Sequence, residues 1–324
     1  MANIAITKYC NLKCPYCFAE DMMTEKDKKN IDLNILKNIL SWLEKTPRER
    51  VGLIGGEPTL HPQFKEILSI VNNHCSKNNT DSILFTNGIN LQPFLQYISP
   101  QMSVLININS PKNMSEDYFL ALNKVLNILY LKNKLSEENS QFTCGCNLCL
   151  EIEDYSFFWD IIDKFKIKRV RVSVTAPMNF EYKQNKELYY TKLKPVFLNF
   201  ILNAYYRKVK VGIDCNHIPD CYFTDLELSL IKKVTNKDII NDFCIPCVDI
   251  TADFKASPCF GSYDSLIDCN KFNNCEELRN FFLKGVIVDK TNNNNFGKCN
   301  DCIEFKNKKC QGGCLSFSKL SKND

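Results

Sequence analysis

The sequence predicts an α/β fold built around a mainly parallel sheet. Strand-like and helix-like segments alternate about six times over the first two thirds of the 324 residues. Strand, helix and strand in succession give parallel strands joined by right-handed crossovers. The length exceeds the usual single domain, so we expect a large domain at residues 1–214 and a smaller one at residues 215–324. Periodicity leaves two arrangements open, an open doubly wound sheet and a partial barrel.

The strand-like segments are short apolar runs or alternations between turn residues. They cover residues 4–6, 51–54, 82–85, 104–108, 141–146 and 169–174. The helix-like segments carry apolar residues at helical spacing, and Asp32 is placed to cap the first of them. They cover residues 33–46, 62–76, 91–98, 115–132, 155–165 and 183–206.

Composition and charge narrow the class of partner. The chain has 41 basic and 37 acidic residues, a balance that speaks against nucleic acid and against an anionic membrane as partners. No apolar run is long enough to span a bilayer, and the first residues enter a strand without the features of a signal peptide. We therefore expect a cytoplasmic protein. Its 18 cysteines then indicate metal binding, because the cytosol keeps thiols reduced.

Three of these cysteines, Cys10, Cys14 and Cys17, lie within eight residues directly after the first strand. Three thiolates can hold three corners of an iron–sulfur cube and leave one iron free for another ligand. The alternative is a zinc site completed by a distant histidine. The C-x3-C-x2-C spacing, with Tyr16 before the third cysteine, resembles the signature of the radical SAM superfamily.

That resemblance implies a partial (β/α)6 barrel of the TIM type, with functional residues at the C-terminal ends of the strands. It implies a 4Fe-4S cluster on the three catalytic cysteines, whose free iron chelates S-adenosylmethionine while Tyr16 lies against the adenine. Reductive cleavage would give a 5'-deoxyadenosyl radical that abstracts a substrate hydrogen. An external donor such as ferredoxin or flavodoxin would supply the electron.

A second motif follows the second strand, at Gly55, Gly56, Glu57 and Pro58. The family places a GGE motif here, whose polar groups contact the amino group of S-adenosylmethionine. Glycines allow close backbone approach, and a carboxylate complements an ammonium group. By itself the motif could be an ordinary tight turn.

Polar residues at the later strand ends are further candidates for the sugar, carboxylate and adenine of the cofactor. They are Thr86, Asn87, Asn107, Asn109, Ser110, Asn147, Arg171 and Ser173. The alternative for each is a satisfied polar group at a strand terminus, and Asn87-Gly88 is also a common turn.

The C-terminal third is rich in cysteine and resembles the SPASM extension of radical SAM enzymes. By that resemblance Cys244, Cys247, Cys259 and Cys314 would hold a first auxiliary 4Fe-4S cluster. Three ligands of a second would come from Cys299, Cys302 and Cys310.

Two departures from the SPASM pattern leave alternatives open. The interval between Cys302 and Cys310 is seven residues rather than five, and no cysteine follows Cys314 to complete the second cluster. The fourth position could be open to substrate or filled by Cys269, Cys275 or another group. The pair Cys215 and Cys221 could replace Cys244 and Cys247, and a zinc ribbon of Cys244, Cys247, Cys299 and Cys302 is a further alternative.

Other cysteines and histidines are interpreted as structural. Cys144 and Cys146 share one face of a strand, which favours packing for them and for Cys149 over a cluster or an active-site role. His61 and His74 are expected to be structural rather than ligating.

The first functional hypothesis is an anaerobic maturase that modifies a ribosomally made peptide, for instance by a crosslink. The barrel starts near residue 3, so we expect recognition at the barrel mouth, in the C-terminal region or through a partner. The second hypothesis is a radical SAM oxidoreductase acting on a small molecule, or on a side chain as in sulfatase maturation. The third, from another class, is a non-catalytic iron–sulfur or zinc protein, against which the motif at Glu57 argues.

Overall fold

The structure, a computed structural model, describes residues 1–17, 19–24, 30–135, 140–176, 182, 185–214, 218–235, 244–294 and 297–318. Cys215 and the first two residues of the helix predicted at residues 183–206 lie outside these ranges.

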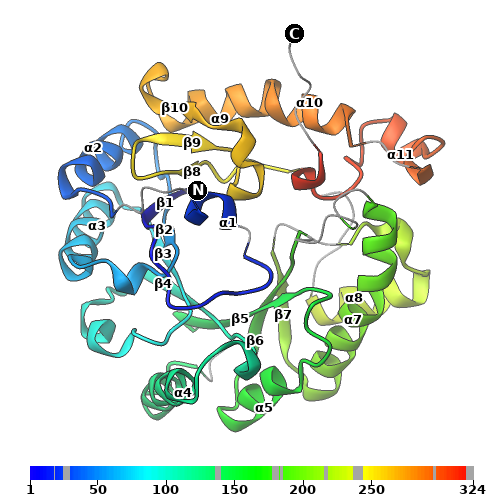
Figure 1. Ribbon diagram of the computed structural model, residues 1–324, viewed down its shortest axis with the longest axis horizontal. Coiled ribbons are helices and arrows are strands. Elements are labelled where there is room, and N and C mark those ends of the chain that lie inside the picture. The colour runs from blue at the N-terminus through cyan, green and yellow to red at the C-terminus, as the bar shows by residue number, and fades with distance from the viewer. Residues whose placement is uncertain are drawn as a thin grey trace.

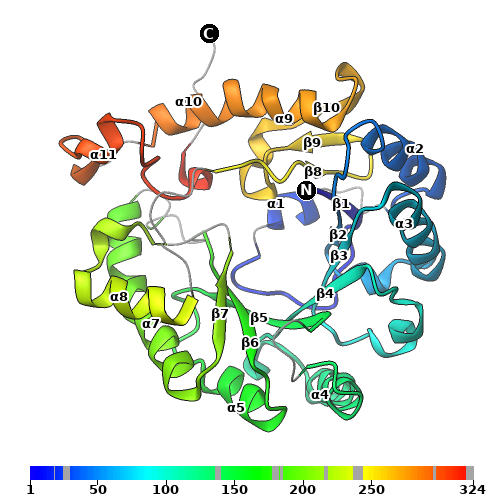
Figure 2. The same ribbon diagram turned by 180° about the vertical axis from the view of Figure 1, so that it is seen from behind.

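Seven parallel strands form the body of the described fold, and each pairs with the next along the chain. They are β1 (Ala2–Thr7), β2 (Val51–Gly55), β3 (Ser82–Thr86), β4 (Met102–Asn107), β5 (Phe142–Leu148), β6 (Arg169–Val174) and β7 (Lys210–Ile213). Figure 1 shows them curving around a central space, and Figure 2 shows the same curve from behind. The predicted α/β partial barrel is confirmed.

Helices cover the outside of this curve (Figure 1). They are α2 (Leu33–Leu43), α3 (Phe64–Asn78), α4 (Glu116–Leu131), α5 (Ser156–Lys164), α7 (Lys186–Arg207) and α8 (Asp225–Thr235). Asp32 caps α2 as predicted, because its side chain accepts a hydrogen bond from Asn34 N at 2.7 Å. Ser115 caps α4 in the same way, accepting from Tyr118 N at 3.3 Å. The segment predicted as a helix at residues 91–98 is a 3-10 helix over Gln92–Tyr97.

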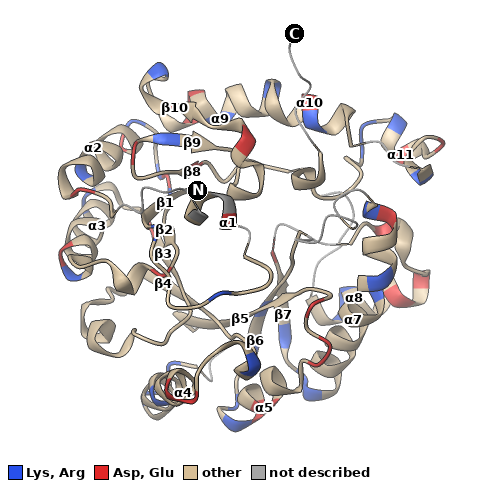
Figure 3. Cartoon of the chain, in the orientation of Figure 1, with Lys and Arg blue, Asp and Glu red and all other residues tan. Residues whose placement is uncertain are grey.

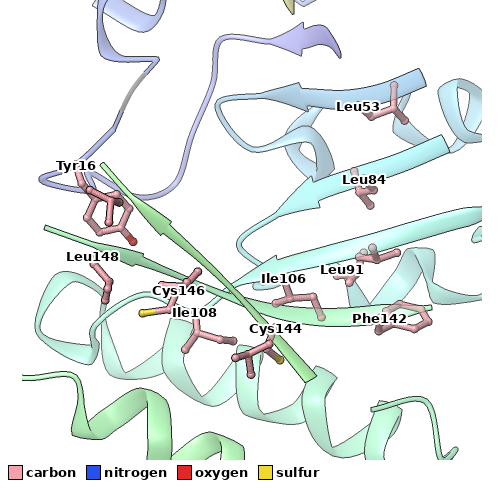
Figure 4. Packing of buried hydrophobic residues seen from close by; sticks show 14 of the residues in the cluster. Tyr16, Leu53, Leu84, Leu91, Ile106, Ile108, Phe142, Cys144, Cys146 and Leu148 are labelled. Carbon is pink, nitrogen blue, oxygen red and sulfur yellow. The ribbon is translucent and has the colours of Figure 1, made fainter. Parts of the chain in front are cut away.

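The two faces of the strands pack differently, because successive side chains point to opposite sides. Leu53, Leu84 and Ile106 belong to the main core between strands and helices, and Figure 4 shows them on one side of the sheet. Cys144 and Cys146 pack in this same core, at 0% and 2% exposure. Cys149 is buried there too, at 1% exposure, and the packing interpretation of the three cysteines stays a prediction.

The other face lines the interior of the barrel. Ala5 of β1 and Ile54 of β2 form a second, smaller core there, against which Phe85 of β3 packs. Met22, from the short helix α1 (Glu20–Thr24), and Phe260 complete that core. The residues that follow the cysteine loop therefore pack against the interior face of β1 and β2.

The C-terminal region continues the sheet. The strand β8 (Asp249–Ile250) is parallel to β1, β9 (Lys255–Ser257) is antiparallel to β8, and β10 (Ile267–Asp268) is antiparallel to β9. The helices α9 (Cys275–Lys284), α10 (Val286–Asn292) and α11 (Ile303–Lys306) follow along the edge of the molecule (Figure 1). The predicted domain boundary at residue 214 falls directly after β7. The strands β8 to β10 beyond it belong to the same sheet, and the division into two domains stays a prediction.

Charged residues of both signs are spread along the drawn chain. Figure 3 shows basic and acidic residues interspersed on the outer helices. Among the helices described, none is long and apolar enough to cross a membrane.

Candidate active site and iron–sulfur centres

The cysteine loop leaves the C-terminal end of β1 and carries Cys10, Cys14 and Cys17, all partly exposed. Burial raises the pKa of all three thiols. For Cys14 burial and the neighbouring thiols of Cys17 and Cys10 raise the pKa to about 12. The structure thus brings the three predicted thiols close enough to repel one another when ionised.

The donor set fits an iron–sulfur cluster. The Cys10 sulfur accepts a hydrogen bond from Leu12 N at 3.5 Å, and such bonds stabilise cluster thiolates. Ligands around a cube stand farther apart than the four ligands of one zinc ion. Within the described ranges no three His, Cys, Asp or Glu side chains are placed to hold a single metal ion.

The two glycines of the second motif hold the start of the cysteine loop. Gly56 N donates to Thr7 O at 2.8 Å, and Glu57 N donates to Tyr9 O at 2.7 Å. A Cβ atom on Gly56 would lie 2.2 Å from Tyr9 O, and one on Gly55 would lie 2.3 Å from Thr7 O. The close approach predicted for a ligand is here an approach to the loop backbone, and the contact of both glycines with S-adenosylmethionine stays a prediction.

The Glu57 carboxylate is buried at the ends of β2 and β3, with 1% exposure. It accepts hydrogen bonds from Thr59 N at 3.1 Å, Thr59 Oγ1 at 2.6 Å, Thr86 Oγ1 at 2.7 Å and Asn87 N at 2.7 Å. Burial raises its pKa, and these donors oppose the rise. The carboxylate thus joins two strand ends, while its predicted contact with an ammonium group, and that of Pro58 beside it, stay predictions.

Two asparagines at later strand ends contact the cysteine loop directly. Asn87 donates through Nδ2 to Asn11 Oδ1 at 2.7 Å. The Asn109 Oδ1 atom accepts from the Tyr16 hydroxyl and from the Cys14 thiol, the latter at 3.2 Å. The polar strand ends therefore position the loop, and Tyr16 is buried against the core at 6% exposure.

Three further candidates lie on or near the interior face of the strands. Asn107 of β4 lies opposite Gly145 of β5, where a Cβ would come 2.8 Å from its Oδ1. Asn147 and Ser173 are register partners on β5 and β6. Ser110 instead accepts from Lys112 N at 3.3 Å and caps a 3-10 helix. The cofactor contacts of these four residues stay predictions.

Arg171 points across the barrel interior and is already paired. Its guanidinium donates to the Asp214 carboxylate directly after β7, and it lies 5.8 Å from the centroid of the Phe85 ring. A role in cofactor binding stays a prediction for this residue, which the structure shows in an ion pair.

The cysteines of the first auxiliary set come together in the C-terminal region. Burial raises the pKa of Cys244 to about 12, and the thiols of Cys314 and Cys247 act in the same direction. Burial likewise raises the pKa of Cys259, with Asp249, Cys244 and Cys314 adding to it. The thiols of these four cysteines therefore act on one another's pKa values, and their ligation of a cluster stays a prediction.

The second set forms on two short turns. Cys302 N donates to Cys299 O at 3.2 Å, and Gly312 N donates to the Cys310 sulfur at 3.3 Å. This N–H to sulfur contact has the same two-residue spacing as the one at Cys10. Cys269 and Cys275 are buried in the main core, and a role for either as the fourth ligand stays a prediction.

Sequence reasoning missed a buried lysine between the two auxiliary sets. Lys186, at the start of α7, is 7% exposed, and its ammonium donates to Asn294 O at 3.2 Å. Burial lowers its pKa to about 8, while the thiols of Cys299, Cys314 and Cys310 act against that change. No motif marks a lysine at the start of a helix. Asp214 and Asn11 were missed for the same reason, since only the fold shows their partners.

Taken together, the fold and the cysteine loop define an iron–sulfur enzyme built on a partial barrel. A family described as a 4Fe-4S single cluster domain matches residues 3–116. The chain is 26% identical over 306 residues to a protein named probable GTP 3',8-cyclase from Methanococcus maripaludis, covering 88% of this chain and 93% of that relative. It is 24% identical over 329 residues to a cysteine-type anaerobic sulfatase-maturating enzyme from Clostridium novyi, covering 94% and 84%.

One solved structure, native anSMEcpe with bound AdoMet and Kp18Cys peptide, matches with a TM-score of 0.67 and 18% identity. The match covers 100% of this chain and 91% of that chain, and it shows the shared fold. The family match, these relatives and the shared fold support a radical SAM enzyme with a SPASM-like, cysteine-rich C-terminal region. The 4Fe-4S family match and the AdoMet-bound structure of the same fold support iron–sulfur clusters and S-adenosylmethionine as cofactors.

Proposed function

We propose that this radical SAM enzyme modifies a side chain of a peptide or protein. The observation that carries the proposal is the charge of the barrel interior. In the described strands β1 to β7, Arg171 is the one basic residue beyond the first position of a strand, and Asp214 neutralises it. Arg169 and Lys210 open their strands at the end opposite the cysteine loop.

A nucleoside triphosphate needs several cationic groups around its phosphates, and arginine and lysine supply them in proteins. The interior offers neutral amides and hydroxyls instead, from Asn107, Asn147 and Ser173. Such groups suit the uncharged backbone and side chains of a peptide. This supports a peptide over the GTP that the name of the Methanococcus relative suggests. The sulfatase-maturating relative and the peptide-bound solved structure support it as well.

Bound S-adenosylmethionine supplies, on reduction, the oxidant that removes a hydrogen atom from the substrate. The chain itself positions that chemistry. Asn109 and Asn87 orient the cysteine loop, and the backbone of Gly56 holds the loop against β2. An external one-electron donor of the ferredoxin or flavodoxin type completes the system. If the enzyme is a crosslinking maturase, the product is a crosslinked peptide. If it acts as in sulfatase maturation, the product is an oxidised serine or cysteine side chain.

The test compares substrates in one anaerobic assay. Reconstituted, reduced enzyme receives S-adenosylmethionine with either GTP or peptides encoded beside its gene. We expect a peptide to raise the rate of 5'-deoxyadenosine formation and to lose two hydrogens, with tandem mass spectrometry separating a crosslink from a single oxidised side chain. Conversion of GTP, with every peptide unchanged, would overturn the proposal.

A further inference from the structure

The second auxiliary set has three thiols in the sequence motif, from Cys299, Cys302 and Cys310, and Cys314 interacts with the first set instead. A cube held by three thiolates keeps one iron open, so a fourth ligand decides whether this centre binds another molecule or only carries electrons. The fold supplies a fourth thiol from a segment outside the motif.

That segment is the 3-10 helix Asp220–Tyr222, which lies between β7 and α8. The Lys298 ammonium, next to Cys299, lies 4.6 Å from the centroid of the Tyr222 ring. On the other side, a Cβ on Gly313 would lie 3.2 Å from Pro219 Cγ. Contacts before and after Cys221 thus hold it against the turns that carry the second set.

Tyr190 of α7 contacts both the 3-10 helix and the end of the cysteine motif. Its ring centroid lies 5.5 Å from that of Tyr222, and its hydroxyl accepts a hydrogen bond from Cys314 N at 3.1 Å. Tyr190 is fully buried, so the short helix and the end of the cysteine motif share one rigid support. The position of Cys221 is therefore set by packing on both sides.

The thiol of Cys221 interacts electrostatically with the thiols of Cys310, Cys299 and Cys302. Cys221 is nevertheless exposed as a residue, unlike the buried cysteines Cys269 and Cys275. An exposed thiol beside three others of a cluster motif has the chemistry of a ligand: it loses its proton and binds iron, and the cluster then covers it.

We propose that Cys221 is the fourth ligand of a second auxiliary 4Fe-4S cluster, with Cys299, Cys302 and Cys310. The centre then has no open iron and transfers electrons without binding substrate. This assignment extends the iron–sulfur part of the proposed function and is independent of its substrate. It also removes Cys221 from an early pair with Cys215.

The first test uses the wild-type protein. Anaerobic alkylation with iodoacetamide, followed by peptide mapping, measures the reactivity of Cys221 in the cluster-loaded and the cluster-free protein. We expect Cys221 to be protected at least tenfold in the loaded protein, together with Cys299, Cys302 and Cys310. Equal labelling of Cys221 in both forms, with the other three protected, would overturn the assignment.

The second test counts iron in a background that lacks the first site. In the triple variant with Cys10, Cys14 and Cys17 changed to alanine, two auxiliary cubes hold about eight irons per chain. We expect Cys221→Ala to lower this to about four, or to about seven with the EPR signal of an oxidised three-iron cluster. Where the remaining three thiolates keep the whole cube, about eight irons stay and the EPR spectrum changes, because one iron is then open. Cys221→Ser keeps the iron, because a serine oxygen can replace the thiolate.

The matched control is Cys75→Ala, which removes a buried thiol of α3 outside both sets. It should leave iron, sulfide and the EPR spectrum of the triple variant unchanged. If Cys221→Ala has the iron content and spectrum of this control, the fourth ligand is another group and the proposal is wrong. Neither test needs substrate or S-adenosylmethionine, so a wrong substrate proposal leaves both readable.

Discussion

Gly56 illustrates how single residues set the site. A Cβ there would lie 2.2 Å from Tyr9 O, 2.6 Å from Tyr9 C and 3.0 Å from Cys10 N. All three are backbone atoms of the cysteine loop, so the clash cannot be relieved by rotating a side chain. The sequence predicts a glycine with a close neighbour, and the structure identifies that neighbour as the chain's own loop.

Gly56→Ala is therefore expected to displace Cys10 and lower the occupancy of the first cluster. In a protein with otherwise intact cysteines, we predict a loss of up to about four irons per chain, with 5'-deoxyadenosine formation at least tenfold slower. Iron analysis and chromatography of the nucleoside measure both.

The matched control is Gly212→Ala on β7, where the nearest atom to a new Cβ is Val170 O at 3.8 Å. This variant should keep its iron and its rate. Full iron and full rate in Gly56→Ala would contradict the claim that the glycine holds the loop.

At the scale of elements, a buried ion pair joins the C-terminal helix α9 to the start of the barrel. Arg279 of α9 donates to both carboxylate oxygens of Glu49, at 2.6 and 3.1 Å, two residues before β2. The Glu49 side chain is 5% exposed. Burial acts to raise the pKa of Glu49, but Arg279 and the amino group of Met1 outweigh it and hold the pKa below its usual value.

Glu49→Gln is expected to lower the free energy of unfolding at pH 7 by about 3 kcal/mol, because the Arg279 charge then stays buried without its partner. A depressed carboxyl pKa stabilises the fold above the unfolded pKa, and this contribution is lost as the pH falls through the folded pKa. The difference between variant and wild type should therefore shrink in acid. Denaturant titrations at several pH values measure it.

Glu44→Gln serves as the control, since its partner Lys77 is 73% exposed and the pair lies on the surface. Its stability should stay close to that of the wild type. Equal stability of both variants at pH 7 would show that the ion pair of Glu49 does not anchor α9.

The elements also show what the sequence could predict. The six predicted strands and their helices are present, because each is long enough for its periodicity to be visible. The strands β7 to β10 were missed, since they have two to four residues and β7 contains Gly212. Such short strands form because they pair with β6, with β1 and with one another. These pairings join distant parts of the chain, so no local sequence pattern predicts them.

At the scale of the whole molecule, some residues of the site are close together in the sequence, and others meet only in the folded chain. Cys10, Cys14 and Cys17 lie in one loop, so their spacing and its resemblance to the radical SAM signature predicted the first cluster. Other partners are far apart in the chain and meet only after folding: Asn109 with Tyr16, Arg171 with Asp214, and Cys221 with Cys310. The same holds for Lys186, which comes close to the cysteines of the auxiliary sets only when the chain folds.

The central claim is a radical SAM enzyme whose C-terminal cysteines carry additional clusters. The most direct test is anaerobic reconstitution of the wild type beside the Cys10, Cys14 and Cys17 to alanine variant, with iron, sulfide and 5'-deoxyadenosine measured after reduction. We expect the wild type to cleave S-adenosylmethionine, and the variant to lose cleavage while keeping about two thirds of the iron, as three four-iron clusters require. No cleavage by the wild type, with zinc in place of iron, would contradict the account.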